Sequence, residues 1–488
     1  MPKVATIDPR FQSYNIEMVE VIGGRFWKPY GSTKSTLPDT KSAAPGGIDP
    51  GLFEQRTPID LSNPRLRKLA TALGPAYVRV SGTWANTLYF HNSDAPAPAS
   101  PPQGFGGVLT RPQWKGVVDF SKAVNAELVT SFSASAGTRN ASGTWTPVEA
   151  KKILDYTHSI GGSIAAAEFI NEPTFPSAAG VPKDYDGAAY GRDFAVFQPF
   201  FRKAAPKALL LGPGSVGEGI DFVPTKLLPS KELLADLGPN PVDVFSYHFY
   251  GAVSERCASA MPKIGTTPAA ALTDDWLTRT DRVEDFYAGL RDTYAPGKPM
   301  WLTETGQTAC GGDRWAATYI DTFRYLDQLG TLAHRNVKVV IHNTLAASDY
   351  GLIDEKTLIP RPNYWAALLW HNTMGTTVLD AGTSPSPSVH IYAQCMKNQP
   401  GGVTLLAINL NQTETQSLTV PEKSTRYTLT APALSSHTIQ LNGQDLSLSA
   451  NGDVPSPTGV ATAKGTVPLP AASITFLTLA GANNPVCK

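Results

Sequence analysis

Apolar runs and amphipathic stretches alternate over the first three quarters of the chain. The apolar runs are short enough to be buried strands, and the stretches between them show helical periodicity. Within residues 319–329, for example, Tyr319, Phe323 and Leu326 recur at helical spacing. The runs predict strands at 14–19, 76–80, 127–132, 164–170, 208–211, 242–247, 299–303 and 337–341. The main helical stretches are 147–158, 284–291 and 319–329.

Eight strand–helix repeats predict an α/β protein with a closed parallel (β/α)8 barrel, a TIM barrel. Functional side chains in such a barrel lie at the carboxyl ends of the strands. A doubly wound open sheet is the alternative, but no glycine-rich phosphate loop follows any predicted strand. We therefore expect the barrel.

The helical pattern disappears after about residue 376. Short strands separated by Gly, Pro, Ser and Asn predict a C-terminal β-sandwich. These strands are 389–393, 403–410, 427–430, 438–441 and 474–479. We expect the N-terminal segment to add a strand to this domain. The expected divisions are 1–12 (sandwich strand), 13–375 (barrel) and 376–488 (sandwich). The insertions 23–51 and 94–107, rich in Pro and Gly, are expected to be loops over the barrel mouth.

Composition limits the classes of partner. The 488-residue chain is 42% hydrophobic and 17% charged, as in a globular protein. Lys and Arg together number 41, and so do Asp and Glu, so no net charge attracts nucleic acid. No stretch approaches the roughly 20 apolar residues of a membrane span. We expect a monomer without a nucleic-acid or membrane partner.

The four cysteines bear on the compartment. Cys395 and Cys487 flank the C-terminal segment, and Cys257 and Cys310 each follow a predicted barrel strand. An even number so placed indicates two disulfides and export, with four free thiols as the alternative. The sequence after Met1 has no apolar leader, so we expect a secreted or periplasmic mature chain whose leader has been removed.

Two glutamates stand at predicted strand ends, 132 residues apart (304 − 172). Glu172 follows the run 164–170 within Asn171-Glu172-Pro173, and Glu304 follows the run 299–303. If the two carboxyl groups lie about 5–5.5 Å apart, such a pair can serve as the acid/base and the nucleophile of a retaining glycosidase. A separation of roughly 6.5–9.5 Å would mean inversion. The proline favours an extended or turn conformation for Glu172. As a general acid, Glu172 needs a raised pKa. A surface turn is the alternative for this tripeptide.

His248 and Tyr250 end the neighbouring predicted strand and are candidate donors that keep Glu304 ionised. The alternative is that both belong to an aromatic core. The histidines show no metal-ligand spacing with Cys or Asp, and no nucleophile-elbow motif is present. We therefore expect neither a metal nor a cofactor.

Several motifs in order carry a family resemblance over nearly the whole chain. They are Tyr77-Val78-Arg79-Val80-Ser81-Gly82-Thr83, Asn171-Glu172-Pro173, Trp301-Leu302-Thr303-Glu304-Thr305, Asp349-Tyr350-Gly351-Leu352-Ile353-Asp354-Glu355 and Leu405-Leu406-Ala407-Ile408-Asn409-Leu410. With these motifs the chain resembles heparanase and the β-glucuronidases of glycoside hydrolase family 79, a family of retaining (β/α)8 hydrolases. The resemblance implies that Glu172 is the acid/base and Glu304 the nucleophile.

The resemblance also implies a site for a glucuronide carboxylate. Its ligands would be the backbone N–H groups of Gly311 and Gly312 and the hydroxyl of Tyr350, because amides without side chains approach an anion closely. Asn171 is placed to bind a sugar hydroxyl beside the reacting carbon. Further positions lining the family's sugar site are matched by Glu17, Thr83 and Asn343. For Glu17, a structural salt bridge is the alternative.

The chain also departs from the family. Mammalian heparanase has a long excised linker where residues 94–107 are short and rich in proline, so we expect one chain active without excision. Basic clusters for heparan sulfate are not evident. Cys395 and Cys487 match the family's sandwich disulfide. Cys257–Cys310 has no family counterpart, and we expect it to join two active-site loops.

These observations lead to one expected function and three alternatives. We expect a retaining β-glucuronidase, heparanase-like, acting on glucuronic acid in glycosaminoglycan-type glycans, with endo action favoured. The alternatives are an exo-β-glucuronidase, a related hydrolase of neutral glycosides, and a non-catalytic glycan-binding protein.

Overall fold

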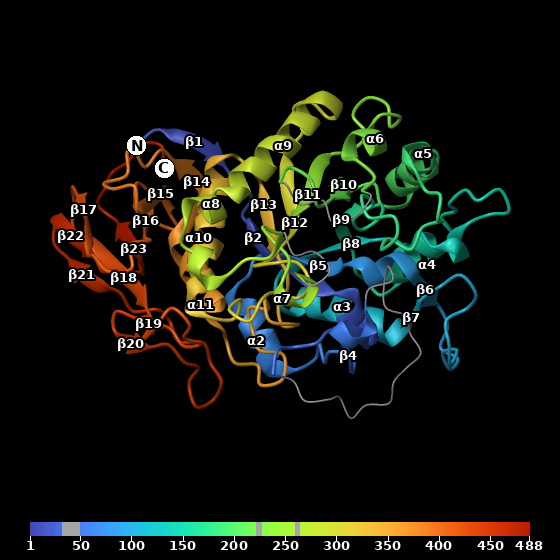
Figure 1. Cartoon of the computed structure of the whole chain (residues 1–488), viewed down its shortest axis with the longest axis horizontal. Helices are drawn as coiled ribbons and strands as arrows, with labels where there is room; N and C mark the ends of the chain where they lie inside the picture. Colours follow the sequence, from blue (N-terminus) through green and yellow to red (C-terminus); the bar gives the residue numbers. More distant parts are fainter. Residues whose placement is uncertain (32–48, 221–226, 259–263) are drawn as a thin grey trace.

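Eight parallel strands close into a barrel, as the sequence predicted (Figure 1). The structure is a computed structural model that describes residues 1–31, 49–220, 227–258 and 264–488. The barrel strands are β2 (Gln12–Glu17), β5 (Ala76–Ser81), β8 (Ala126–Ser131), β9 (Ile164–Glu168), β10 (Leu209–Ser215), β11 (Val244–Phe249), β12 (Met300–Thr305) and β13 (Val339–His342). They neighbour one another in chain order, and β13 closes the barrel onto β2.

Helices surround the barrel (Figure 1). Local sequence explains several of their starts: Asn63 caps the helix that begins with Pro64, and Thr110 forms a capping box with Gln113. The longer helices are α2 (Pro64–Ala72), α3 (Arg111–Ala123), α4 (Val148–Ser159), α5 (Gly187–Ala204), α9 (Arg279–Tyr294), α10 (Tyr319–His334) and α11 (Pro362–Thr373). The shorter ones are α1 (Met18–Ile22), α6 (Ser230–Leu234), α7 (Glu255–Ala258) and α8 (Asp274–Leu277).

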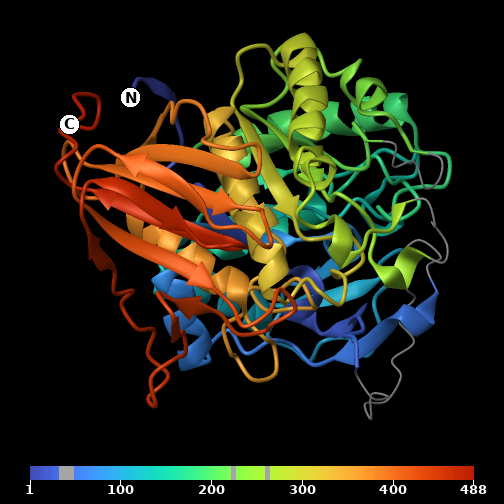
Figure 2. The same cartoon turned by 60° about the vertical axis from the view of Figure 1, so that its left-hand side comes forward.

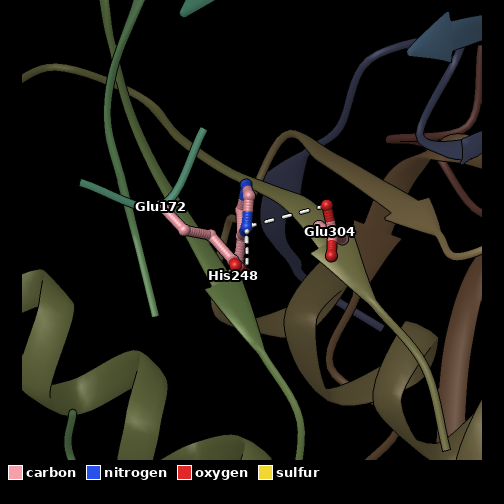
Figure 3. Close-up of side chains that lie close together, drawn as sticks. All are labelled: Glu172, His248 and Glu304. Atoms are coloured by element: carbon pink, nitrogen blue, oxygen red, sulfur yellow. Dashed lines mark hydrogen bonds and ion pairs between the residues drawn. The ribbon is translucent and has the colours of Figure 1, made fainter. Parts of the chain in front are cut away.

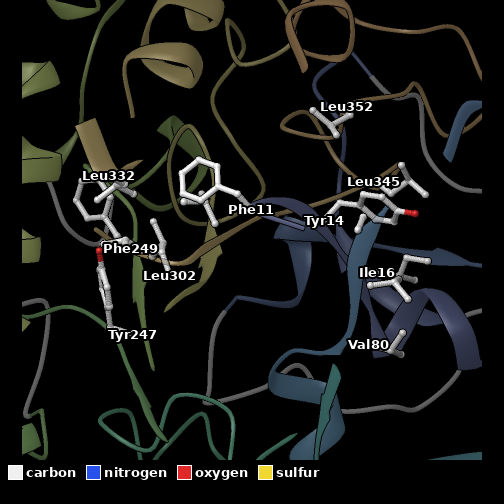
Figure 4. Packing of buried hydrophobic residues seen from close by; sticks show 14 of the residues in the cluster. Phe11, Tyr14, Ile16, Val80, Tyr247, Phe249, Leu302, Leu332, Leu345 and Leu352 are labelled. Carbon is white, nitrogen blue, oxygen red and sulfur yellow. The ribbon is translucent and has the colours of Figure 1, made fainter. Parts of the chain in front are cut away.

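Alternation along the barrel strands separates two environments. Side chains such as Ile16, Val80 and Leu302 belong to the large core that the strands share with the surrounding helices, part of which is drawn in Figure 4. A second apolar cluster fills the lower part of the barrel, where the rings of Tyr77 and Trp301 lie 4.8 Å apart. This cluster forms a dry floor beneath the polar residues at the carboxyl ends of the strands.

The C-terminal segment forms an antiparallel sheet beside the barrel (Figure 2). Its nine strands are β1 (Lys3–Thr6), β14 (Met374–Leu379), β15 (Val389–Met396), β16 (Val403–Asn409), β18 (Ser424–Thr430), β19 (Gln440–Leu441), β20 (Gln444–Asp445), β21 (Val460–Thr462) and β23 (Ser473–Leu479). As expected, the N-terminal strand joins this sheet, by pairing with β14. Both chain ends lie at the sheet (Figure 1).

The two layers of the sandwich differ in size. Its second layer in the described residues is the pair β17 (Gln416–Val420) and β22 (Gly465–Leu469), whose Val420 and Val467 pack on Leu405 and Leu477 of the large sheet. The opposite face of the large sheet joins the main core together with α10 and α11. The domain limits 1–12, 13–375 and 376–488 remain a prediction.

Short paired strands lie at the two ends of each expected insertion. In the first, β3 (Gly24–Trp27) pairs with β4 (Phe53–Arg56), and residues 32–48 lie outside the described part of the chain. The second lies between the parallel strands β6 (Leu88–His91) and β7 (Gly107–Thr110).

Two disulfides are present, Cys257–Cys310 and Cys395–Cys487. Among the described residues, no helix has the length and apolarity needed to cross a bilayer.

Candidate active site

Glu172 lies in the turn after β9, with a side chain 17% exposed. Its φ of 49° is in the left-handed region, which is uncommon for a residue other than glycine, so the segment turns rather than continuing extended. Asn171 holds this turn: its N–H donates to Asn86 Oδ1 at 2.9 Å, and its own Oδ1 accepts from Arg79 at 2.7 Å. The apolar run predicted to be a strand up to Ile170 therefore ends earlier, at Glu168.

Glu304 is the penultimate residue of β12, and its side chain is 8% exposed. The Tyr250 hydroxyl donates to Oε1 at 2.8 Å, and Arg79 Nη1 donates to Oε2 at 2.9 Å. Each oxygen of Glu304 therefore accepts one hydrogen bond, and one of the two comes from a charged donor. The expected donor role of Tyr250 is therefore consistent with this geometry.

His248, in β11, lies between the two glutamates (Figure 3). Its Nδ1 is 3.1 Å from Glu172 Oε1 and 3.8 Å from Glu304 Oε2. One oxygen of each glutamate and one ring nitrogen of His248 all lie within 4.8 Å of one another. The barrel thus brings together three residues that each follow a different predicted strand.

The pKa values of both His248 and Glu172 are raised, but by a different balance of burial and neighbouring charges. Burial and the charge of Arg79 disfavour the His248 imidazolium, but the charge of Glu304 and the contacts with Glu168 and Glu172 raise the pKa of His248 to about 9. For Glu172, burial raises the pKa, and the nearby charge of Glu304 raises it further against the hydrogen bond from His248. A raised pKa is what a general acid needs near neutral pH.

A buried ion-pair network beneath the glutamates was missed in the sequence. Arg79 is 1% exposed and bridges Glu304 to Glu168, whose Oε2 lies 2.8 Å from Nη2. Ser246 and Thr303 also donate to Glu168, at 2.8 and 2.7 Å. Burial opposes the ionisation of Glu168, but the charge of Arg79, the contact with His248 and the hydrogen bond from Thr303 lower its pKa. A charged residue inside each of two apolar runs was the signal that could have revealed this pair.

Asn343 connects three of the other predicted residues. Its Nδ2 lies 3.0 Å from Glu17 Oε1, 2.9 Å from the Tyr250 hydroxyl and 3.1 Å from the Tyr350 hydroxyl. Glu17 Oε2 and Asn343 Oδ1 are buried without a hydrogen-bond partner. No ion pair of Glu17 is found within the described ranges, so the salt-bridge alternative has no support there. Burial and the charge of Glu304 raise the pKa of Glu17 well above its ordinary value.

The three residues expected to bind a carboxylate also meet. A Cβ added to Gly312 would lie 2.9 Å from the backbone nitrogen of Tyr350, so this loop packs directly against the tyrosine. The N–H of Gly312 donates to Thr308 O at 3.2 Å and would have to exchange that bond for a ligand. Thr83 begins the 3-10 helix η3 (Thr83–Thr87), directly after a glycine packed against the Glu17 carboxylate.

Glu172, His248 and Glu304 could also, by distance alone, surround a cation. The guanidinium of Arg79 lies 2.9 Å from Glu304 and 3.2 Å from His248 Nε2. This fixed positive charge disfavours a metal ion at the same place. The arrangement suits proton transfer and nucleophilic attack by carboxylates better than cation binding.

Comparison with known proteins identifies the family. Residues 55–330 match the glycosyl hydrolase family 79 N-terminal domain. Heparanase-like protein 1 of Arabidopsis thaliana is 29% identical over 455 residues, covering 82% of this chain and 80% of the relative. Hyaluronoglucuronidase of Hirudo nipponia is 28% identical over 435 residues, covering 80% and 84%. The structure of a 4-O-α-L-rhamnosyl-β-D-glucuronidase from Fusarium oxysporum, 15% identical, matches the fold with a TM-score of 0.63 over 98% of this chain and 97% of that one. The chain therefore belongs to glycoside hydrolase family 79, the heparanase and β-glucuronidase family, and is a glycoside hydrolase.

Proposed function

We propose that the protein is a retaining β-glucuronidase in which Glu304 is the nucleophile and Glu172 the acid/base. The observation that carries the proposal is the approach of their carboxylate oxygens to within 4.8 Å. Retaining glycosidases hold the two carboxyl groups about 5–5.5 Å apart, whereas inverting enzymes leave roughly 6.5–9.5 Å for a water molecule. The close approach supports double displacement.

The reaction then has two steps. Glu304 attacks the anomeric carbon while Glu172 gives its proton to the departing glycosidic oxygen, and a covalent glycosyl-enzyme forms. Glu172, now ionised, takes a proton from water, which attacks the same carbon and releases Glu304. Tyr250 and Arg79 orient the nucleophile by hydrogen bonds to its two oxygens, and His248 stabilises the carboxylate that Glu172 becomes after the first step.

The proposed substrate is a β-linked glucuronic acid. Its carboxylate would bind the amides of Gly311 and Gly312 and the hydroxyl of Tyr350; the packing of Gly312 against the backbone of Tyr350 supports this. The unpaired buried oxygens of Glu17 and Asn343 offer acceptors for sugar hydroxyls. Asn171 and Thr83 would complete the sugar site.

Two modes of attack on the glycan have support. We favour endo action on a glycosaminoglycan-type chain, because the likeness to heparanase-like proteins extends over most of the length. Exo action is the second candidate, since the side chains of Glu172 and Glu304 are only 17% and 8% exposed and Trp27 of β3 packs close to Gly311.

A side-by-side digestion tests the function. Heparan sulfate, its unsulfated precursor and p-nitrophenyl β-glucuronide are incubated with the enzyme and with the Glu304→Gln variant. Oligosaccharides indicate endo action and free glucuronic acid exo action. Equal turnover of a neutral p-nitrophenyl glycoside would favour the neutral-glycoside alternative. Full activity of Glu304→Gln would contradict the nucleophile assignment. An initial β-anomer seen by NMR indicates retention.

We also propose that the enzyme acts outside the cytosol. Two disulfides and no free cysteine in the described part of the chain fit an oxidising compartment, secreted or periplasmic. A single chain carries every residue of the proposed site, so we expect the monomer to be active.

A further inference from the structure

The loop that carries Gly311 and Gly312 has an unusual backbone. Cys310, Gly311 and Gly312 have φ values of 63°, 84° and 80°, three consecutive residues in the left-handed region. Glycine adopts this region freely, but Cys310 does not. Such a conformation persists only where the surroundings impose it.

Arg256, on α7 in the neighbouring loop, binds this loop through hydrogen bonds. Its Nη1 donates to Cys310 O at 2.8 Å and to Gly312 O at 2.6 Å, so one guanidinium nitrogen spans both sides of Gly311. The Arg256 side chain is 5% exposed and lies outside the set of residues predicted from sequence. Because both acceptors are backbone carbonyls, the contact fixes the direction of the peptide planes rather than a side chain.

The same guanidinium connects two further loops. Its Nε donates to Lys28 O at 2.8 Å, and its Nη2 pairs with Asp349, the residue before Tyr350. The Tyr30 ring lies 3.9 Å from its central carbon. Arg256 thus joins the Gly311–Gly312 segment to the element that carries the third expected carboxylate ligand, while its own charge is balanced by Asp349.

A disulfide fixes the element from which Arg256 projects. Cys257, the next residue, is bonded to Cys310, the residue before Gly311. Ser254 Oγ also donates to Cys310 O, at 3.0 Å. Arg256 and the disulfide therefore act on the same short segment from the same side.

We propose that Arg256, anchored by the Cys257–Cys310 disulfide, is a positioning residue that determines specificity for a carboxylate-bearing sugar. It sets the peptide groups of Gly311 and Gly312 beside Tyr350, so that a sugar with a carboxylate at C6 is bound in preference to one with a hydroxymethyl group. The inference rests on the proposed glucuronidase function and concerns recognition rather than bond cleavage.

The test compares two substrates that differ only at C6, p-nitrophenyl β-glucuronide and p-nitrophenyl β-glucoside, in wild type and Arg256→Lys. Lysine keeps the charge but cannot reach all four acceptors. We expect the ratio of kcat/KM for glucuronide over glucoside to fall about tenfold, mainly through a higher KM, as for loss of one hydrogen bond from a charged donor. Inhibition constants of glucuronic acid and glucose give the same ratio where glucoside turnover is slow.

Arg139 provides a matched control. It is also buried, pairs with Asp193 at 2.7 Å and donates to the carbonyls of Gly143 and Ala134, but in the loop after β8. Arg139→Lys is expected to cost similar stability and to leave the ratio within about twofold. Cys257→Ser/Cys310→Ser should lower the ratio, and Cys395→Ser/Cys487→Ser should not.

The outcomes separate the two proposals. A wild type that does not prefer the glucuronide refutes the proposed function, and the inference with it. A wild type that prefers it, with an unchanged ratio in folded Arg256→Lys, overturns the inference alone. An equal fall of the ratio in Arg139→Lys also overturns it, because the effect would then follow from lost stability.

Discussion

The proton on His248 should make folding stability depend on pH in a defined window. The perturbation is His248→Gln, which keeps an amide donor near Glu172 but cannot titrate. In the folded protein the charge of Glu304 and the contacts with Glu168 and Glu172 outweigh burial and the charge of Arg79, and they raise the pKa of His248 to about 9, compared with 6.5 for an unperturbed histidine.

The sign and size follow from these two values. Between pH 6.5 and 9 the folded state holds one proton more than the unfolded chain, so stability falls as pH rises through this window. The slope is about 1.4 kcal/mol per pH unit, which amounts to about 3 kcal/mol across the window. The contribution of His248 is complete below pH 6.5 and absent above pH 9.

The assay is urea unfolding followed by tryptophan fluorescence at intervals between pH 5.5 and 9.5. Wild type should lose about 3 kcal/mol more of its unfolding free energy across the window than His248→Gln. Glu20, whose pKa burial raises to about 7, titrates in both proteins and cancels in the difference. Repeating the comparison in a Glu172→Gln background removes the titration of the adjacent carboxyl group, and a smaller difference of the same sign is expected.

Parallel curves for wild type and His248→Gln would refute the reasoning. They would mean that His248 is already neutral at pH 6.5 in the folded state, with Nε2 accepting from Arg79, 3.2 Å away. The role proposed for the imidazolium beside Glu172 would then be wrong, although the two glutamates could still act as the catalytic pair.

Three further outcomes are expected. Tyr250→Phe removes the donor 2.8 Å from Glu304 and should lower kcat about 10- to 100-fold with little change in melting temperature. Steady-state kinetics and thermal unfolding measure the two quantities, and an unchanged kcat would contradict a role for this hydrogen bond. Arg79→Met leaves two buried carboxylates without their partner and should lower the free energy of unfolding in urea by about 3–5 kcal/mol. A decrease below about 1 kcal/mol would contradict this prediction. Cys395→Ser opens the Cys395–Cys487 link across 92 residues and should cost about 4–5 kcal/mol in the chain-entropy account, to be compared with wild type by calorimetry; an equal melting temperature would rule this out.

The sequence was sufficient for the parts of the fold that depend on local pattern. Barrel strands are buried on both faces and read as continuous apolar runs, so their existence was predicted and only their ends moved, as in β11 and β12. The strands β17 and β22 were missed because each exposes one face and alternates weakly with polar residues. Glu172 and Glu304 were identifiable because each follows an apolar run.

The remaining part of the site depends on barrel closure. Arg79, from β5, reaches Glu304 on β12 only because the sheet closes on itself, and no spacing along the chain encodes that contact. Arg256 is harder still to predict, because its partners are mostly backbone carbonyls, which every residue has. Side-chain chemistry is visible in a sequence, whereas the choice among identical peptide groups is not.

Helix α10 has one more consequence. Fourteen of its sixteen residues are buried, because the barrel covers one side and the C-terminal sheet the other. A shortened protein that ends after the barrel would present this helix to water as an apolar surface and would tend to aggregate. The C-terminal sheet is therefore not a removable addition: in evolution or in engineering, the barrel and the sheet have to be inherited together.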